Sequence, residues 1–256
     1  MTSGFPVADA VLRSRHGNIL VITLNRPEVR NAIDSALSLG VLDALATLDD
    51  DDDLRVGVLT GAGGTFCAGM DLRAFAHSGV PARIDDVFRD RCRKPLVAAV
   101  EGVAVGGGLE LALVADLLVA GRDARFGSPE VKFGLFPGGG ALLRLPEMLP
   151  RSLVTEMALT GEPIDAATAL QHGLVNRVCE PGAVLDVALE LAGAIARNAP
   201  LGVDAATHLV RRGRGRSEEE LWPEQRALVD SVFHSDDAGE GARAFAEKRA
   251  PEWKGR

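Results

Sequence analysis

The sequence predicts an α/β protein, built from strands and helices in layers. Short apolar runs with β-branched residues recur along the first two thirds of the chain, and glycine-rich loops and helical patterns follow them. After residue 150 the apolar spacing is helical, apart from a strand-like run at 174–178. We therefore expect a layered core that is followed by a helical carboxyl-terminal part.

The predicted elements follow in order along the chain. The run ILVITL at 19–24 predicts a strand, which Pro27 follows, and a second strand at 55–60 precedes the glycines of 61–64. Between them a helix is predicted over 34–48, and the acidic stretch 49–53 is interpreted as a solvated turn rather than a metal site. The remaining predictions are strands at 95–100 and 117–120 and helices over 109–115, 185–196, 203–212, 218–232 and 238–249.

Length and composition exclude several classes of protein. The 256 residues, 46% hydrophobic and 25% charged, suit one large soluble domain or one domain with an appendage. No apolar run reaches the ~18 residues of a membrane span, and the start of the chain lacks the pattern of a signal peptide, so a cytoplasmic protein is expected. The three cysteines are widely spaced and predict neither a disulfide framework nor a metal site.

The net charge of −8 argues against a nucleic-acid surface. An acidic ligand would therefore need a local positive field, from a few cationic side chains or from backbone N–H groups. The arginine-rich segment 211–216 has no interleaved aromatic residues and is interpreted as a solvated loop.

Familiar catalytic and nucleotide-binding motifs are absent from the sequence. The loop GAGGTF at 61–66 lacks the third glycine of a dinucleotide-binding fingerprint, and no GxxxxGK[ST] phosphate loop occurs. No GxSxG motif is present, and none of the five histidines lies in a recognisable triad context. The sequence thus supports neither an NAD-dependent enzyme, nor an NTPase, nor an acyl-enzyme route.

The first candidate site is the run Gly106-Gly107-Gly108-Leu109-Glu110 at the start of an apolar helix. Glycines permit close approach of the backbone, and the free N–H groups of a helix start can bind an oxyanion. Glu110 lies in an otherwise apolar run, where an unpaired carboxylate is costly. The alternative is an ordinary glutamate that the helix dipole favours.

Two further features could belong to the same site. Glu130 directly follows Pro129, whose ring restricts where the carboxylate can point, although an ordinary capping residue is the alternative. Met70 lies in a glycine-flanked loop after a strand and could supply a second backbone N–H to an oxyanion hole; the alternative is a plain strand-to-helix turn. The spacing of Glu110 and Glu130 does not show that they meet.

Six segments together resemble the crotonase (enoyl-CoA hydratase/isomerase) superfamily. They occur in the expected order over nearly the whole chain: NRP…RNA at 25–32, GTFCAGMDL at 64–72, AVEG…GGGLE at 99–110, ARFGSPE at 124–130, FGLFPGGG at 133–140 and FAEKR at 245–249.

The resemblance implies a spiral of ββα units with a carboxyl-terminal helical region that trimerises, often as a dimer of trimers. Residues 1–198 would form the core with the active site, and 199–256 the oligomerisation region. The N–H groups of Met70 and Gly107 would hold the thioester oxygen of an acyl-CoA. Further contacts to substrate and coenzyme A are implied for Arg30, Ala32, Ala68, Asp71, Leu72 and Lys248, the last reaching a neighbouring subunit's ligand.

Within this superfamily, hydratases carry a glutamate at both positions that Glu110 and Glu130 occupy. The resemblance therefore implies a 2-enoyl-CoA hydratase, which adds water syn to a trans-2-enoyl-CoA and gives a 3-hydroxyacyl-CoA; whether it serves fatty-acid β-oxidation, a sterol or another pathway stays open. Glu110 would activate the water and Glu130 would protonate C2. No metal or redox cofactor is implied, because coenzyme A is part of the substrate.

Alternatives to this function stay open. An enoyl-CoA isomerase would use Glu130 alone, and a non-catalytic fold member would bind acyl-CoA or RNA. Met70 replaces a common alanine and residues 138–145 are more apolar than usual, so the acyl chain is left open. Asp71 is interpreted first as a helix N-cap, and Asp116 as the partner in a structural hydrogen bond.

Overall fold

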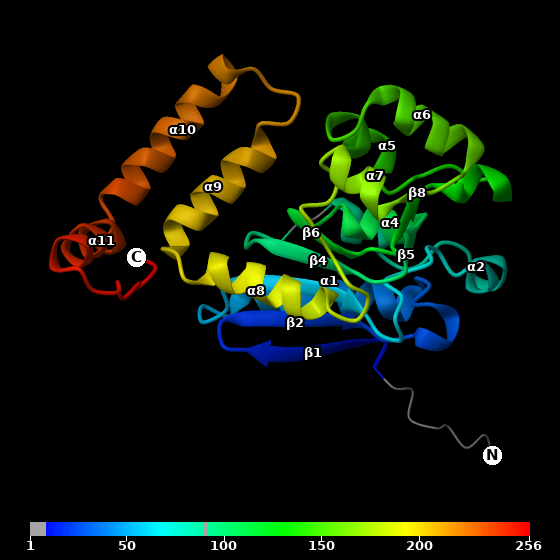
Figure 1. Ribbon diagram of the computed structural model, residues 1–256, viewed down its shortest axis with the longest axis horizontal. Coiled ribbons are helices and arrows are strands. Elements are labelled where there is room, and N and C mark those ends of the chain that lie inside the picture. Colours follow the sequence, from blue (N-terminus) through cyan, green and yellow to red (C-terminus); the bar gives the residue numbers. More distant parts are fainter. Residues whose placement is uncertain (1–8, 90–91) are drawn as a thin grey trace.

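The computed structural model describes residues 9–89 and 92–256, and two β-sheets form its core (Figure 1). The larger sheet has the strand order β1-β2-β3-β4-β6-β9, and the smaller one β5-β7-β8. The first eight residues, which belong to the stretch predicted not to be a signal peptide, lie outside the described residues. The strands are β1 (Val11–His16), β2 (Ile19–Leu24), β3 (Val56–Gly61), β4 (Leu96–Val100), β5 (Val103–Val105), β6 (Leu117–Gly121), β7 (Arg125–Gly127), β8 (Ile164–Asp165) and β9 (Arg177–Cys179).

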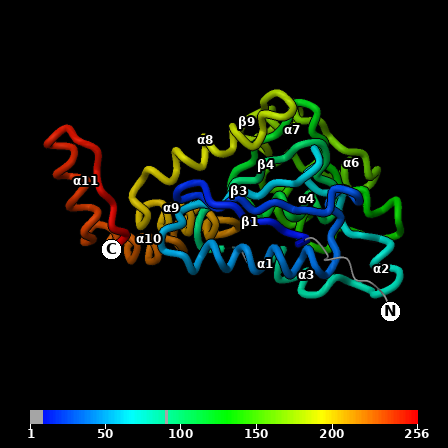
Figure 2. Tube along the Cα trace, turned by 90° about the horizontal axis from the view of Figure 1, so that it is seen from below, coloured from blue at the N-terminus to red at the C-terminus, as the bar shows by residue number. Residues whose placement is uncertain are grey.

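Helices surround these sheets and continue beyond them (Figures 1 and 2). The α-helices are α1 (Ser35–Asp50), α2 (Leu72–Ser78), α3 (Ile84–Arg89), α4 (Gly107–Ala112), α5 (Ala141–Arg144), α6 (Arg151–Thr160), α7 (Ala166–Gln171), α8 (Val184–Ala196), α9 (Pro200–Arg212), α10 (Glu218–Phe233) and α11 (Asp236–Glu247). The short 3-10 helices are η1 (Pro27–Val29), η2 (Pro129–Phe133) and η3 (Leu145–Glu147). None of the helices in the described part of the chain is long and apolar enough to cross a bilayer.

The larger sheet is parallel except at its first pair, where β1 runs antiparallel to β2. Alternate side chains along its strands point to opposite faces, so that Val21, Val58 and Val97 share one face. That face packs against α8 through Val184 and Ala188. The other face forms the main core with α1 and α4, and Figure 2 shows α8 and α1 on opposite sides of the sheet.

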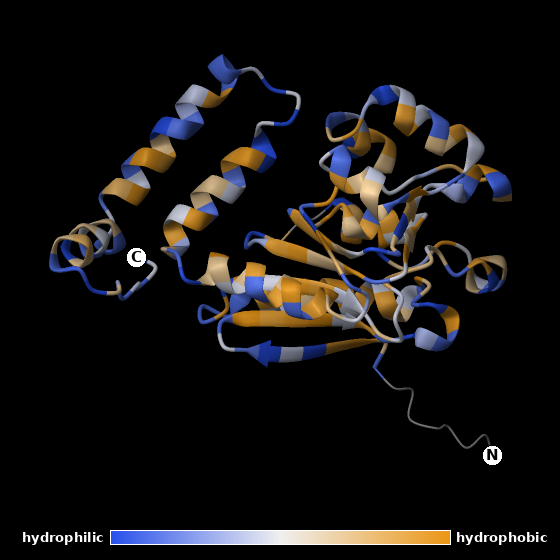
Figure 3. Cartoon of the chain, in the orientation of Figure 1, coloured by the Kyte–Doolittle hydropathy of each residue, from blue (hydrophilic) through white to orange (hydrophobic). Residues whose placement is uncertain are grey.

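The predicted strands and helices of the core are confirmed, but four strands were not predicted. β1 is an edge strand with only Val11 buried, and its sequence VLRSRH lacks the apolar run that marks its neighbours (Figure 3). β5, β7 and β8 have three residues or fewer, which is too short for a periodic signal. The expectation of a single strand-like run after residue 150 was therefore wrong, since β8 and β9 both lie there.

The carboxyl-terminal helices α9, α10 and α11 form an arm that projects from the core (Figures 1 and 2). None of the residues of α9 or α10 is buried. Even large apolar side chains are exposed on the arm: Phe233 on α10 is 72% exposed and Phe245 on α11 is 89% exposed. The predicted division at residues 198 and 199 falls in the short link before α9.

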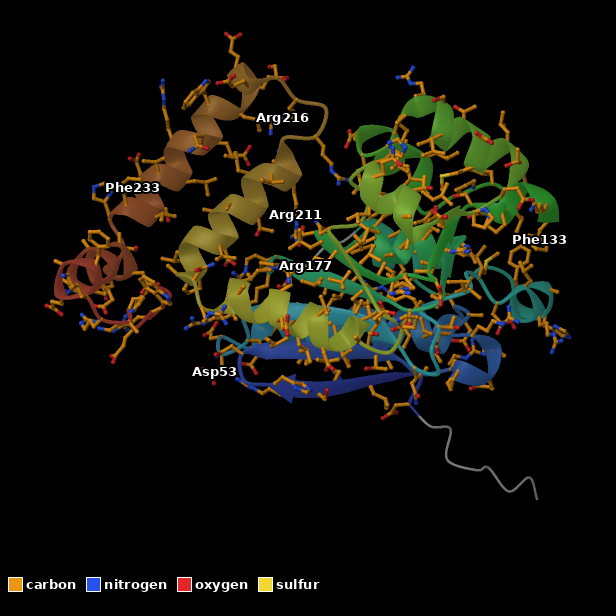
Figure 4. All side chains as sticks on the ribbon, in the orientation of Figure 1. Asp53, Phe133, Arg177, Arg211, Arg216 and Phe233 are labelled. Atoms are coloured by element: carbon orange, nitrogen blue, oxygen red, sulfur yellow. The ribbon has the colours of Figure 1, made fainter. Side chains whose placement is uncertain are left out.

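Arg211 holds the arm to the core, and its interpretation as part of a solvated loop was wrong. It lies within α9, and its Nε and Nη2 each donate to the carboxylate of Asp116 at 2.6 Å (Figure 4). Its guanidinium also donates to the carbonyl oxygens of Cys92 and Lys94. Asp116 accepts in addition from the N–H of Leu96 at 2.9 Å, so the structural hydrogen bond predicted for Asp116 is confirmed.

Candidate active site

A cavity of about 340 Å³ brings together the four residues that the sequence singled out. Met70, Gly107, Glu110 and Glu130 all line it. They come from the loop after β3, the start of α4 and the turn η2, and these segments meet beyond the carboxyl ends of parallel strands. Ala68 and Leu72, implied as substrate contacts, line the same cavity.

The backbone around Met70 is arranged so that its N–H is left for a ligand. Ile33 donates to the carbonyl of Gly69 at 2.8 Å and accepts from the N–H of Asp71 at 2.9 Å. Because this bridge uses the residues on either side of Met70, the N–H of Met70 points away from Ile33. Within the described residues no acceptor is recorded for it.

Gly107 supplies a second N–H next to the first. It is the first residue of α4, where the N–H has no partner inside the helix. A Cβ placed on Gly107 would lie 3.6 Å from the nitrogen of Met70, so Gly107 lies next to the N–H of Met70. A Cβ on the next residue, Gly108, would lie 2.2 Å from the carbonyl oxygen of Cys67. Glycine is therefore needed for the loop and the helix to approach this closely.

Glu110 is a buried carboxyl group at the floor of the cavity, with 4% of its surface exposed. Its Oε1 accepts a hydrogen bond from the N–H of Ala141 at 3.2 Å. Burial raises the pKa of Glu110 to about 7; the N–H of Ala141 opposes the rise and the negative charge of Glu130 adds to it. The group is thus poised to give or take a proton near neutral pH.

Glu130 is held at the start of η2, with Pro129 before it. Its Oε2 is buried and has no hydrogen-bond partner within residues 9–89 and 92–256. Its Oε1 would lie 3.5 Å from a Cβ placed on Gly106, the residue before Gly107. Burial also raises the pKa of Glu130, which favours its protonated form.

The rest of the cavity wall is mostly apolar. It is lined by the side chains of Ile33, Met70, Leu72, Phe75, Val80, Ile84, Phe88, Phe133, Leu135 and Phe136. Phe133 lies at the end of the molecule far from the arm (Figure 4). Besides the two glutamates, Asp85 is the only ionisable side chain among the described lining residues.

The residues implied as contacts to coenzyme A do not all border this cavity. Arg30 and Ala32 form the turn next to it, where the carbonyl of Arg30 accepts from the N–H of Ala68. Asp71 is the N-cap of α2, as expected. The hydrogen bond from the Ala74 N–H, with further help from the guanidinium of Arg26, lowers the pKa of Asp71. Their contacts to coenzyme A stay predictions.

Lys248 lies outside the cavity of its own chain. It ends α11 on the projecting arm, with a left-handed backbone conformation (φ 55°). A role at coenzyme A would therefore require a second subunit, as the resemblance implies.

One positioning residue, Asn31, was missed in the sequence. It is completely buried, and its Nδ2 donates to the carbonyls of Ala62, Thr65 and Phe66, while its Oδ1 accepts from the N–H of Arg26. It thereby ties the turn after β2 to the loop that leads to Met70. Its signal is an asparagine in a left-handed turn (φ 55°), a conformation that asparagine tolerates well.

The site combines two N–H donors that have no acceptor among the described residues with two carboxyl groups of raised pKa in an apolar cavity. It can stabilise an oxyanion and move protons beside it. Residues 14–256 match the enoyl-CoA hydratase/isomerase family.

The chain belongs to the enoyl-CoA hydratase/isomerase family, the crotonase family. Two curated relatives of this crotonase are each 43% identical to it: enoyl-CoA hydratase EchA19 of Mycobacterium tuberculosis, with 96% of both chains aligned, and the carnitinyl-CoA dehydratase of Salmonella arizonae, with 97% of this chain and 100% of the other. The crystal structure of enoyl-CoA hydratase EchA1 from Mycobacterium marinum is 47% identical and superposes with a TM-score of 0.94, covering 97% of this chain and 100% of the other. The expected crotonase-like α/β fold with its carboxyl-terminal helices is confirmed.

Proposed function

We propose that this crotonase is a 2-enoyl-CoA hydratase. The observation that carries the proposal is the pairing of Glu110 and Glu130, two buried carboxyl groups of raised pKa, on one cavity. Their mutual repulsion favours a site that holds a single negative charge at rest. One carboxylate and one carboxylic acid are what the addition of water to a conjugated double bond needs.

The reaction follows from these positions. The thioester oxygen accepts hydrogen bonds from the N–H groups of Met70 and Gly107, which stabilise the enolate that forms on it. Ionised Glu110 takes a proton from water as the water oxygen bonds to C3, and the electrons of the double bond move towards the thioester oxygen. The electrons then return to C2, which takes the proton of Glu130. Passage of a proton from Glu110 to Glu130 restores the site.

The apolar wall supports an apolar acyl group as substrate. A second candidate is the dehydration of a carnitinyl-CoA, which is the activity in the name of one relative. The observation in its favour is Asp85, which borders the cavity together with the rings of Phe75, Phe88 and Phe133. A carboxylate and aromatic rings are suitable partners for the quaternary ammonium of a carnitinyl group.

A spectrophotometric assay of the conjugated enoyl thioester tests both candidates. We expect loss of absorbance with crotonyl-CoA, decenoyl-CoA or a branched, sterol-like enoyl-CoA, and no rise in absorbance with carnitinyl-CoA. A rise with carnitinyl-CoA alone would establish the second candidate. Inactivity on every substrate, with coenzyme A binding intact, would overturn the hydratase proposal.

Glu110→Gln separates a hydratase from an isomerase that uses Glu130 alone. Hydration should fall by a factor of ~10²–10⁴, because the general base is lost. Isomerisation of a 3-enoyl-CoA should persist if Glu110 is a bystander. A non-catalytic member that binds RNA would instead be recognised by tight, salt-sensitive binding of labelled RNA.

We also propose that the arm is the subunit interface of a trimer or a dimer of trimers. Its helices leave apolar side chains such as Phe233 and Phe245 exposed, and hydrophobic and hydrophilic residues alternate along the arm (Figure 3). A second copy of the chain would cover them, and would bring Lys248 towards a neighbouring site.

A further inference from the structure

Arg144, to which the sequence assigned no role, connects two walls of the cavity. It is the last residue of α5, and its Nη1 donates to the carbonyl of Gly139 at 2.9 Å. Its Nη2 makes a short hydrogen bond to the carbonyl of Phe88, on α3. One guanidinium thus joins the turn at 138–140 to the helix that carries the ring of Phe88.

The turn that Arg144 holds is also the turn that holds Glu110. The N–H of Ala141 donates to Oε1 of Glu110. A Cβ placed on Gly139 would lie 2.6 Å from Oε2 of Glu110 and 2.3 Å from the ring of Phe88. Gly139 is therefore packed between the carboxyl group and the ring, and a displacement of the turn would displace the carboxyl group with it.

The charges around Glu110 come from several elements. Glu130 on η2 faces it, Arg144 on α5 is the cation that acts on it, and Asp85 on α3 borders the same cavity. Arg144 is in turn faced by Arg214, which pairs with Glu147 at 3.4 Å. The positive charge of Arg144 thus opposes the burial and the repulsion that disfavour ionisation of Glu110.

We propose that Arg144 is a positioning residue for Glu110: its hydrogen bonds to the carbonyls of Gly139 and Phe88 fix the turn that orients the carboxyl group. The proposal rests on the proposed hydratase function, in which Glu110 must be ionised to take a proton from water. Arg144 itself touches neither the reacting atoms nor the water in this scheme.

The test compares three variants in the hydration assay from pH 5 to pH 9. Arg144→Gln removes the positive charge and the pair of hydrogen bonds to Gly139 and Phe88. We expect kcat at its plateau to fall ~10–100-fold with little change in KM. We also expect the acidic limb of its pH profile to move to higher pH, because the Glu110 carboxylate loses a nearby cation. Arg144→Lys keeps the positive charge but cannot make both hydrogen bonds at once, so the acidic limb of its pH profile should stay in place while kcat falls ~10-fold.

Arg214→Gln is the matched control, since it removes a neighbouring guanidinium that makes no contact with Glu110 or its turn. It should keep both kcat and the acidic limb. A wild-type kcat in Arg144→Gln or in Arg144→Lys would overturn the proposal, and so would an equal loss of kcat in Arg214→Gln. If Arg144→Gln does not fold, Arg144→Lys alone decides. Failure of the hydratase proposal is distinguished by an inactive wild-type enzyme.

Discussion

Replacing Glu110 by glutamine should make the protein more stable at alkaline pH while it removes activity. The native pKa of Glu110 is about 7, against an ordinary value of 4.5. At about 1.4 kcal/mol for each pH unit, ionising this group in the folded protein lowers the free energy of unfolding by about 3 kcal/mol. Glutamine has nearly the same shape, and its oxygen can still accept the N–H of Ala141.

The direction of this pH dependence follows from whether the folded or the unfolded protein binds the proton of Glu110 more tightly. The folded protein binds the proton of Glu110 more tightly than the unfolded chain does. The contribution of protonated Glu110 to the free energy of unfolding is therefore fully present below about pH 4.5. It is lost as the pH rises through about 7. The wild-type protein should therefore lose about 2–3 kcal/mol between pH 5 and pH 8 through this group, and the variant should not.

Urea unfolding at pH 5 and pH 8 measures this difference. The free energy of unfolding of Glu110→Gln, relative to wild type, should be higher at pH 8 than at pH 5 by about 2–3 kcal/mol. Glu156→Gln, at an exposed position on α6, is the control and should show no such change. An effect of Glu110→Gln that is equal at the two pH values would refute the reasoning.

Three other predictions concern the turn, the loop and the arm. Gly139→Ala should lower hydratase activity at least ~100-fold, because its Cβ would collide with Phe88 and Glu110, whereas Gly138→Ala has open space and should stay active in the same assay. Asn31→Ala should lower the free energy of unfolding by about 3 kcal/mol or more in urea, since it leaves several buried backbone groups unpaired; a loss below 1 kcal/mol would contradict this role. Phe233→Glu should reduce the molar mass measured by light scattering, and Leu159→Glu, equally exposed but on the core, should not; an unchanged mass for both would remove Phe233 from the interface.

The core strands could be predicted because they are buried on both faces and therefore read as continuous apolar runs. The two glutamates could be selected because each stands in an unusual local context, after a run of glycines or after a proline. That they share a cavity could not be predicted, since 20 residues and two short strands separate them. Those strands, β6 and β7, are positioned by pairing with β4 and β5, which is a long-range effect.

The roles of Arg144 and Asn31 could not be predicted from the sequence for a related reason. Both act through backbone carbonyls of segments distant in sequence, such as those of Phe88 and Phe66. A carbonyl oxygen has the same chemistry in every residue, so the sequence gives no sign of which one will be bound. Arg211 was misinterpreted in the same way, because its partners at Asp116 and Lys94 lie more than 90 positions earlier.

Two guanidiniums on different elements bind backbone carbonyl groups that lie close together along the chain. Arg144 donates a hydrogen bond to the carbonyl of Phe88, and Arg211 donates hydrogen bonds to the carbonyls of Cys92 and Lys94. Arg211 belongs to the first helix of the arm, whereas Phe88 is part of the cavity wall. The arm that we propose as the subunit interface and the cavity that we propose as the acyl site therefore depend on carbonyl groups only four positions apart in the chain, at Cys92 and Phe88.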